Sequence, residues 1–241
     1  MDQITTLAAS GMASRIDALD LLANNLANAG TAGYKSDRES YTLYLSPDAS
    51  PDGTSRLPLV GSQWTDFSQG LLQTTGVPSD LALSGDGFFA VNGPSGQLYT
   101  RNGSFRASPK GELVTAEGYP VATVSGRPLK LDPDQPFVVT TDGVIRQGGE
   151  ELDRLTVVTF SEPQGLSNRN GTYFQWLSPG AAPVAGASAQ VLQGQLESGN
   201  AAASEGAVRM VSVLRQFEML QKALTLGADM NRRAVEDVAK V

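Results

Sequence analysis

The chain offers few of the side chains on which enzymes usually rely. Its 241 residues include no cysteine and no histidine, which removes thiolate chemistry, the commonest general base and the commonest metal ligand. Glycan hydrolysis would instead need two carboxylates across a cleft, one of them with a raised pKa. The chain has 25 acidic residues, but none lies in a recognisable catalytic motif. We therefore expect no cofactor, no metal and no enzyme activity, and keep a glycan hydrolase as the weaker alternative.

Three short segments resemble ligand sites only superficially. The sequence GDG at 85–87 lacks the helix N-terminus that must follow a phosphate loop, because FFAV at 88–91 is typical of a strand. A tight turn that leads into two core aromatic residues is the better interpretation. Residues 48–53 (DASPDG) lack the remaining ligands of a calcium loop. TDG at 141–143 has the wrong order for an aspartic protease and fits a hairpin turn.

Composition also limits the partners. The formal net charge is −7, and an acidic chain without a basic stripe is a poor match for nucleic acid or an anionic membrane surface. No stretch of about 18 apolar residues is present, so membrane insertion is not expected. The first twenty residues have no basic start and carry acids among their apolar residues, which argues against a cleaved secretory signal.

Both ends of the chain have the spacing of an α-helix. One helix is predicted over about 3–29, ending near a left-handed glycine cap at Gly30, and another over about 204–240. In both, apolar positions alternate steps of three and four, as in a coiled coil. The seams are Ala9, Met12, Ile16, Leu19, Ala23 and Leu26 in the first, and Met210, Val213, Phe217, Leu220, Leu224, Gly227, Asn231, Ala234 and Val238 in the second.

Apolar residues beside the seams, such as Leu22, Val211 and Leu214, exceed what two helices alone can bury. The remainder predicts an exposed apolar stripe, which marks an interaction surface. We therefore predict that the terminal helices are poorly ordered in the free monomer and become ordered on assembly.

The middle of the chain has a different pattern. Short β-rich runs alternate with turn signals, which predicts an antiparallel β domain rather than βαβ units. Loops are predicted at 46–57 and 177–188. The fold class is thus α+β, with an antiparallel β domain inserted between terminal helices that pack as a coiled-coil-like layer. The expected boundaries are 1–35 plus 200–241 for the helical terminal domain, 36–79 for an extended connector and 80–199 for the β domain.

Several motifs, in order, resemble those of the bacterial flagellar axial proteins, the rod and hook subunits of the basal body. LANNLANAGTAGYK (22–35) is similar to their N-terminal motif. GQLESGN (194–200) and LRQFEMLQKAL (214–224) look like their C-terminal motif, although Gly199 stands where the family usually has serine. Their central motif is matched by DLALSGDGFFAV (80–91), YTRNGSF (99–105) and GELVTAEGYPV (111–121). The matches bracket nearly the whole chain.

The resemblance implies a structural subunit of the rod, the drive shaft of the flagellum, with terminal helices lining an inner tube and the β domain outside it. It implies export through the flagellum's own secretion channel without a cleaved signal, and assembly in the periplasm. The implied partners are other rod subunits, further copies of this chain and the export apparatus. Chain length and the segment RQFEM most resemble the proximal rod subunits. A distal rod subunit, a hook-type subunit and a rod-assembly adaptor are the alternatives.

The candidate site is therefore an assembly interface. Asn24, Asn25 and Asn28 close the first helix, and they either cap it within the chain or bond to a neighbouring subunit. Gly33 and Tyr34 are expected to shape the exit from the helix, and Arg101 to fix the β domain internally. The predicted interface residues are Met12, Ile16, Leu19, Asn24, Asn25, Leu26, Asn28, Val213, Phe217, Leu220 and Leu224.

Overall fold

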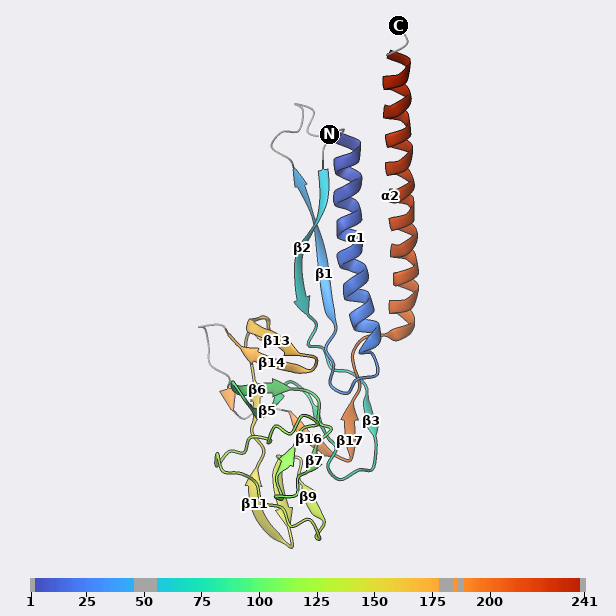
Figure 1. Cartoon of the computed structure of the whole chain (residues 1–241). Helices are drawn as coiled ribbons and strands as arrows, with labels where there is room; N and C mark the ends of the chain where they lie inside the picture. The colour runs from blue at the N-terminus through green and yellow to red at the C-terminus, as the bar shows by residue number, and fades with distance from the viewer. Residues whose placement is uncertain (1–2, 46–55, 178–183, 186–188, 239–241) are drawn as a thin grey trace. The chain divides into compact units, whose positions relative to one another are not determined.

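The computed structural model describes residues 3–45, 56–177, 184–185 and 189–238 (Figure 1). The chain forms two compact units. The helical unit comprises Met1–Ala27, Asp37–Thr65 and Ala202–Val241, and the β unit comprises Asn28–Ser36 and Asp66–Ala201. The chain therefore passes from one unit to the other four times. Most of the two predicted loops, and the whole calcium-like segment, lie outside the described residues.

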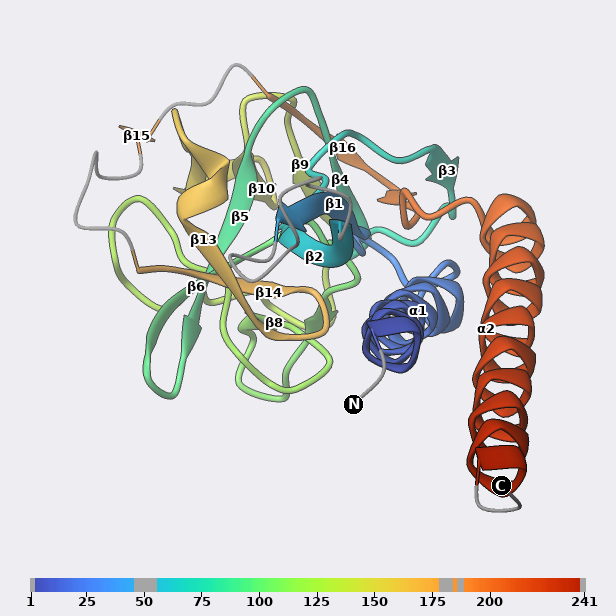
Figure 2. The same ribbon diagram turned by 90° about the horizontal axis from the view of Figure 1, so that it is seen from above.

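In the helical unit, two antiparallel helices pack along each other. Helix α1 spans Gln3–Ala27 and α2 spans Ala203–Val238. Gly11 lies against Leu220, while Leu22 packs on Val213 near the other end of the pair. Strands β1 (Asp37–Leu45) and β2 (Arg56–Thr65) form an antiparallel hairpin, which packs against α1. Within this unit, Figure 2 shows α1 between the hairpin and α2.

The seam of α1 differs from the predicted one. The residues that α1 buries are Ala8, Gly11, Ser14, Ala18 and Leu22, whereas Ala9, Ile16 and Ala23 of the predicted seam are exposed. The physical reason is that α1 packs on two neighbours, α2 and the hairpin, so its buried face is turned away from the strict coiled-coil seam. Small residues on that face let α2 approach closely, and a Cβ atom on Gly11 would lie 3.3 Å from Leu220.

Two further expectations about this region were wrong. Residues 36–79 are not simply an extended connector, because β1 and β2 pair along most of their length with a bulge after Ser40. Backbone amides and carbonyls need hydrogen-bond partners, and those of β1 and β2 bond to one another. Helix α1 ends at Ala27, and Gly30 does not provide a left-handed cap. The left-handed glycine lies further on, at Gly33 with φ +66°.

The β unit is antiparallel throughout its described strand pairs, which confirms the α+β fold class. Its largest sheet has the order β13-β14-β6-β5-β12-β15, a second sheet has the order β11-β10-β9, and β16-β4, β17-β3 and β7-β8 form two-stranded ladders. The strands are β3 (Leu72–Thr74), β4 (Leu81–Ser84), β5 (Phe88–Gly93), β6 (Gly96–Thr100), β7 (Arg106–Ala107), β8 (Leu113–Val114), β9 (Phe137–Val139), β10 (Val144–Gln147), β11 (Glu150–Arg154), β12 (Val157–Thr159), β13 (Leu166–Asn170), β14 (Tyr173–Trp176), β15 (Val184–Ala185), β16 (Gln190–Gln193) and β17 (Gln195–Glu197). A 3-10 turn, η1 (Pro163–Gly165), precedes β13.

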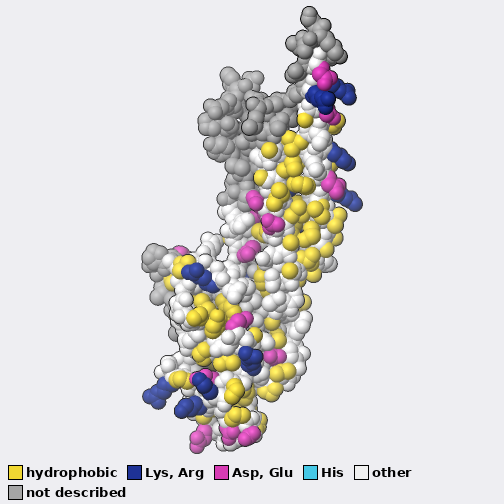
Figure 3. Space-filling view, in the orientation of Figure 1, with side chains coloured by type: hydrophobic (Ala, Val, Ile, Leu, Met, Phe, Trp, Pro, Cys, Tyr) yellow, Lys and Arg dark blue, Asp and Glu magenta, His cyan; other side chains and the backbone are white. Residues whose placement is uncertain are grey.

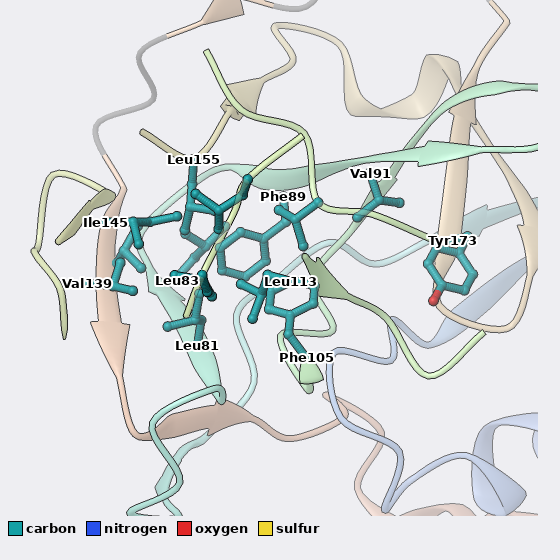
Figure 4. Close-up of a cluster of buried hydrophobic side chains, with 14 residues drawn as sticks. Leu81, Leu83, Phe89, Val91, Phe105, Leu113, Val139, Ile145, Leu155 and Tyr173 are labelled. Atoms are coloured by element: carbon teal, nitrogen blue, oxygen red, sulfur yellow. The ribbon is translucent and has the colours of Figure 1, made fainter. Parts of the chain in front are cut away.

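Strand β5 is buried on both faces and joins two hydrophobic cores. Its side chains alternate, as a strand requires. Phe89 and Val91 enter one core, which Figure 4 shows around Leu83, Leu113 and Ile145. Phe88 and Ala90 enter a second core that is largely aromatic, with Tyr99, Phe160 and Phe174. The expected turn before β5 is also present, with Gly85 at φ +102°.

Candidate assembly interface

Helix α2 carries two apolar faces on opposite sides. On the face toward α1, Val213 is buried and Phe217 and Leu220 are half-buried, as the predicted seam requires. Val208 and Leu226 each lie nine positions from Phe217, which is two and a half turns at about 3.6 residues per turn. They therefore lie on the opposite side of the helix, where their exposures are 74% and 64%.

These exposed residues belong to a continuous row, which we call the outer stripe of α2. Its members recur at steps of three and four along the helix, and all are exposed: Val208, Val211, Arg215, Met219, Lys222, Leu226 and Met230. Figure 3 shows apolar side chains gathered on the helices, with Lys and Arg side chains interspersed with Asp and Glu along the edge of α2. The exposed stripe predicted from Val211 and Leu214 is thus confirmed. A row of large apolar side chains in water marks an interaction surface.

Helix α1 has a different exposed side, which neither α2 nor the hairpin covers. We call it the outer face of α1, and it consists of Ala9, Ala13, Ile16, Asp17, Asp20 and Ala23. Its side chains are mostly small or acidic. Its one large apolar side chain is Ile16, which is 47% exposed.

The structure places the predicted interface residues in three settings. Val213 is buried between the helices, and Met12, Leu19, Leu26, Phe217, Leu220 and Leu224 are half-buried. Ile16 and Asn24 are exposed, and Asn25 and Asn28 are half-buried. A role for any of them between subunits stays a prediction. The sequence predicted an exposed apolar stripe that includes Val211, but it did not identify the other members of the outer stripe of α2, although their spacing opposite the seam was a readable signal.

Asn25 bonds to the backbone of its own chain. Its Nδ2 donates to the Asp37 carbonyl at 2.8 Å, and its Oδ1 accepts from the Asp37 amide at 3.0 Å. This pair of bonds joins the end of α1 to the start of β1. The Asn28 side chain acts locally as well, since its Oδ1 accepts from the Thr31 hydroxyl at 3.3 Å. These bonds favour a role within the subunit for both amides.

We expect Asn25→Ala to lower the free energy of unfolding of the isolated subunit by about 1–3 kcal/mol, because both Asp37 backbone groups lose a partner. Chemical denaturation of the monomer measures this loss. Ser62→Ala, which removes an exposed hydroxyl that lies 2.9 Å from Ser40 in the same unit, is the control and should change stability by less than about 0.5 kcal/mol. A normal monomer with defective assembly would contradict the expectation and place Asn25 at a subunit contact.

A buried charge cluster lies inside the β unit. Lys35, Arg101 and Glu197 have side chains only 0–3% exposed. Lys35 Nζ lies 2.6 Å from Glu197 Oε1, and Arg101 Nη1 lies 3.2 Å from Glu197 Oε2. Burial lowers the pKa of Lys35 and of Arg101, and the Glu197 carboxylate opposes that effect in both cases. We call this cluster the buried triad.

Backbone groups supply further hydrogen bonds to all three side chains of the triad, although Arg101 Nε is buried without a hydrogen-bond partner among the described residues. Lys35 Nζ also donates to the Ser68 carbonyl at 2.6 Å, Arg101 Nη2 donates to the Gly85 carbonyl at 2.8 Å, and Glu197 Oε1 accepts from the Gly70 amide at 2.9 Å. The Arg101 guanidinium also lies over the Phe88 ring, 5.3 Å from its centroid. The internal structural role expected for Arg101 is therefore confirmed.

Asn200 extends the same network. Its Oδ1 accepts from the Ser36 amide at 2.7 Å and its Nδ2 donates to the Asp66 carbonyl at 2.7 Å. The chain enters or leaves the β unit through three segments, 28–36, 66–70 and 195–201. Asn200 and the triad together connect these three segments. Sequence reasoning placed Lys35 and Glu197 in motifs without giving them a role. The sequence signal for their role was that each is a single charged residue within a short motif of mostly small residues.

The β unit also has a surface hollow of about 330 Å³ between the turn after β5 and strands β13 and β14. Its walls include Leu98, Tyr119, Arg169 and Tyr173, but no lining residue is a carboxylate. The hollow therefore does not supply the two acids that glycan hydrolysis needs. Among the described residues, no cluster of three acids suited to a metal ion occurs, and no helix is long and apolar enough to cross a bilayer.

Comparison with known proteins gives consistent matches along the chain. The family described as "Flagella basal body rod protein" matches residues 7–35, and the family described as "Flagellar hook protein FlgE/F/G D1 domain" matches residues 82–147. The flagellar basal-body rod protein FlgF of Caulobacter vibrioides is 34% identical over 229 residues, which cover 92% of each chain. The flagellar basal-body rod protein FlgG of Bacillus subtilis is 29% identical over 251 residues, covering 94% of this chain and 95% of the relative.

Proposed function

This chain belongs to the flagellar basal-body rod protein family, and from that premise we propose that its terminal helices hold it in the rod by packing against helices of neighbouring subunits. It is a structural subunit of the rod. The observation that carries the proposal is the outer stripe of α2, in which five of the seven exposed side chains are large and apolar, on the side of α2 opposite its seam with α1. When helices of neighbouring subunits cover this stripe, apolar surface is removed from water, which is favourable.

The proposed assembly domain is the helix pair together with the β1–β2 hairpin. This differs from the sequence-based boundaries, because Asp37–Thr65 packs with the helices. The interface residues of the sequence analysis keep a supporting role in the proposal. Val213, Phe217 and Leu220 fix the helix pair, so that the outer stripe is presented as one straight row.

The remaining features of the proposal rest on the resemblance of the motifs. The chain is exported through the flagellar secretion channel without a cleaved signal and assembles in the periplasm with other rod subunits. It transmits torque through helix packing, and it needs no cofactor and no catalysis. Its position in the proximal rod is proposed from its length and the segment RQFEM, with the distal rod as the second possibility.

The direct test is a cryo-EM reconstruction of basal bodies from cells with and without the gene. We expect density for this chain in the rod, with its terminal helices in the inner layer, and a rod that stops at that level when the gene is deleted. A complete rod without the gene would contradict the proposal and favour an adaptor.

The proposal also predicts that the helices gain protection on assembly. In a dilute monomer, α2 packs on α1 along one side only, so its amides are expected to exchange at least about tenfold faster than those of β5, which lies between two cores. In isolated rods, the amides of α2 should become as protected as those of β5. Hydrogen exchange followed by mass spectrometry measures both states. Full protection of α2 in a verified monomer would contradict this expectation.

A further inference from the structure

The two exposed helix faces of the helical unit complement each other in size and in charge. The outer stripe of α2 presents large apolar side chains, with Met219 61% and Met230 71% exposed. Three of the six residues on the outer face of α1 are alanines, at positions 9, 13 and 23. A row of alanines allows another helix to approach closely and gives large side chains of that helix grooves in which to lie.

The charges within these faces are opposite. Arg215 and Lys222 are exposed members of the outer stripe, while Asp17 and Asp20 are exposed on the outer face of α1. None of these four side chains takes part in the ion pairs found among the described residues. Glu218 and Asp229 lie at one margin of the outer stripe, so the stripe is basic along its centre rather than over the whole surface of α2. Opposite charges on facing patches favour one pairing and disfavour contacts between like patches.

We infer that the outer stripe of α2 docks on the outer face of α1 of a second copy of this chain. The inference rests on the proposed function and adds the identity and the orientation of the contact. The occupant is a second copy because the same chain carries both halves of the match. Since the two patches differ, the contact is heterologous, and repeated contacts of this kind build an open helical assembly unless the rotation closes into a ring.

The alternatives make different contacts. If two α2 helices paired through their outer stripes, Arg215 and Lys222 would meet like charges across the contact. If α1 paired with α1, Asp17 and Asp20 would do the same. Like charges facing one another are unfavourable, and neither arrangement would use the small residues of α1 to receive the large residues of α2.

Cysteine crosslinking in the full chain tests the contact, because the native sequence contains no cysteine. Cells would express an Ala13→Cys copy and a Met219→Cys copy together, distinguished by different epitope tags. Rods isolated from these cells would be treated with a short bismaleimide. We expect a crosslinked dimer that carries both tags, and little dimer when either variant is expressed alone. Neighbouring pairs, Ala9→Cys with Met219→Cys and Ala13→Cys with Leu226→Cys, cover the shift in register between copies.

A charge exchange provides the second readout. Asp17→Lys with Asp20→Lys in one copy is expected to reduce the yield of the mixed-tag dimer by about fivefold or more. The exchange removes the attraction to Arg215 and Lys222 of the other copy and replaces it with repulsion between like charges. Arg215→Glu with Lys222→Glu in the other copy should restore it. Lys110→Glu, an exposed change in the β unit, is the matched control and should leave the yield unchanged.

The outcomes separate this inference from the proposed function. A dimer of two Met219→Cys copies, or a crosslink from Met219→Cys to a different rod protein, overturns the inference but leaves helix-mediated assembly standing. Intact rods in which no α1 or α2 cysteine reaches any neighbour overturn both. A mixed-tag dimer that the aspartate exchange weakens and the basic exchange restores supports the inference.

Discussion

Glu197→Gln is expected to reduce the free energy of unfolding of the β unit by about 3–5 kcal/mol, because it leaves the buried ammonium of Lys35 and guanidinium of Arg101 without their counter-charge. Domains of ordinary size have about 5–15 kcal/mol in total, so much of the β unit would be unfolded under mild denaturant. Trp176 provides the measurement in a Trp64→Phe background, which removes the other tryptophan, in the helical unit. Trp176 is stacked on Phe160 with ring centroids 5.1 Å apart, and its fluorescence follows the aromatic core of the β unit.

Glu151→Gln is the matched control for that variant. Glu151 forms an ion pair with Arg146 at 3.6 Å, but both side chains are more than half exposed, so its loss is expected to cost less than about 1 kcal/mol. Replacing Lys35, Arg101 and Glu197 together by methionine should recover part of the loss, since no isolated charge stays buried. If Glu197→Gln lost no more stability than Glu151→Gln, the triad would not hold the β unit together.

Gly33→Ala is expected to destabilise the β unit by more than about 3 kcal/mol. A residue with a side chain is strained in the left-handed region by roughly 1–3 kcal/mol, and Gly33 has φ +66°. In addition, a Cβ atom there would lie 2.1 Å from the Asn102 amide nitrogen, so the backbone itself must move. That movement would disturb the bond from the Gly33 amide to the Glu197 carbonyl, which measures 2.7 Å.

Gly30→Ala separates this effect from a general cost of replacing glycine. Gly30 lies three positions away, has no left-handed φ, and has open space where its Cβ would be. Its replacement is expected to be neutral or to stabilise the protein by about 0.4–1 kcal/mol through a less flexible unfolded chain. Urea denaturation followed at Trp176 compares the two variants, and similar midpoints would contradict the account of Gly33.

Local patterns in the sequence predicted the elements well. Helical spacing located both terminal helices to within a few residues, and the seam of α2 faces α1 at Met210, Val213 and Leu220, whereas Asn231, Ala234 and Val238 of that seam lie outside the described side chains. The run at 88–91 was correctly interpreted as a strand with core aromatics, because alternation and the preceding glycines are local signals. Gly33 and Tyr34 were correctly placed at the exit from α1, where Tyr34 is only 2% exposed.

The errors arose where several distant segments decide the outcome. Ala9, Ile16 and Ala23 were wrongly placed in the seam of α1, because the hairpin that shares the buried face of α1 has no signature in the sequence of α1 itself. The roles of Lys35 and Glu197 were not predicted for the same reason. Each is an ordinary charged residue in its own motif, and only the tertiary structure brings the two together with Arg101.

The buried triad also bears on how the chain folds. Lys35 and Glu197 are 162 residues apart in sequence, and contacts between such distant residues raise contact order and slow the search for the native state. The β unit cannot fold completely until residues near 197 are available. A chain that is released N-terminus first therefore completes the β unit only when almost all of it has been released. A fragment of residues 80–199 would lack Lys35, so Glu197 would have Arg101 as its only charged partner. Expression of the β unit by itself therefore calls for a circular permutation or a linker that brings 28–36 beside 195–201.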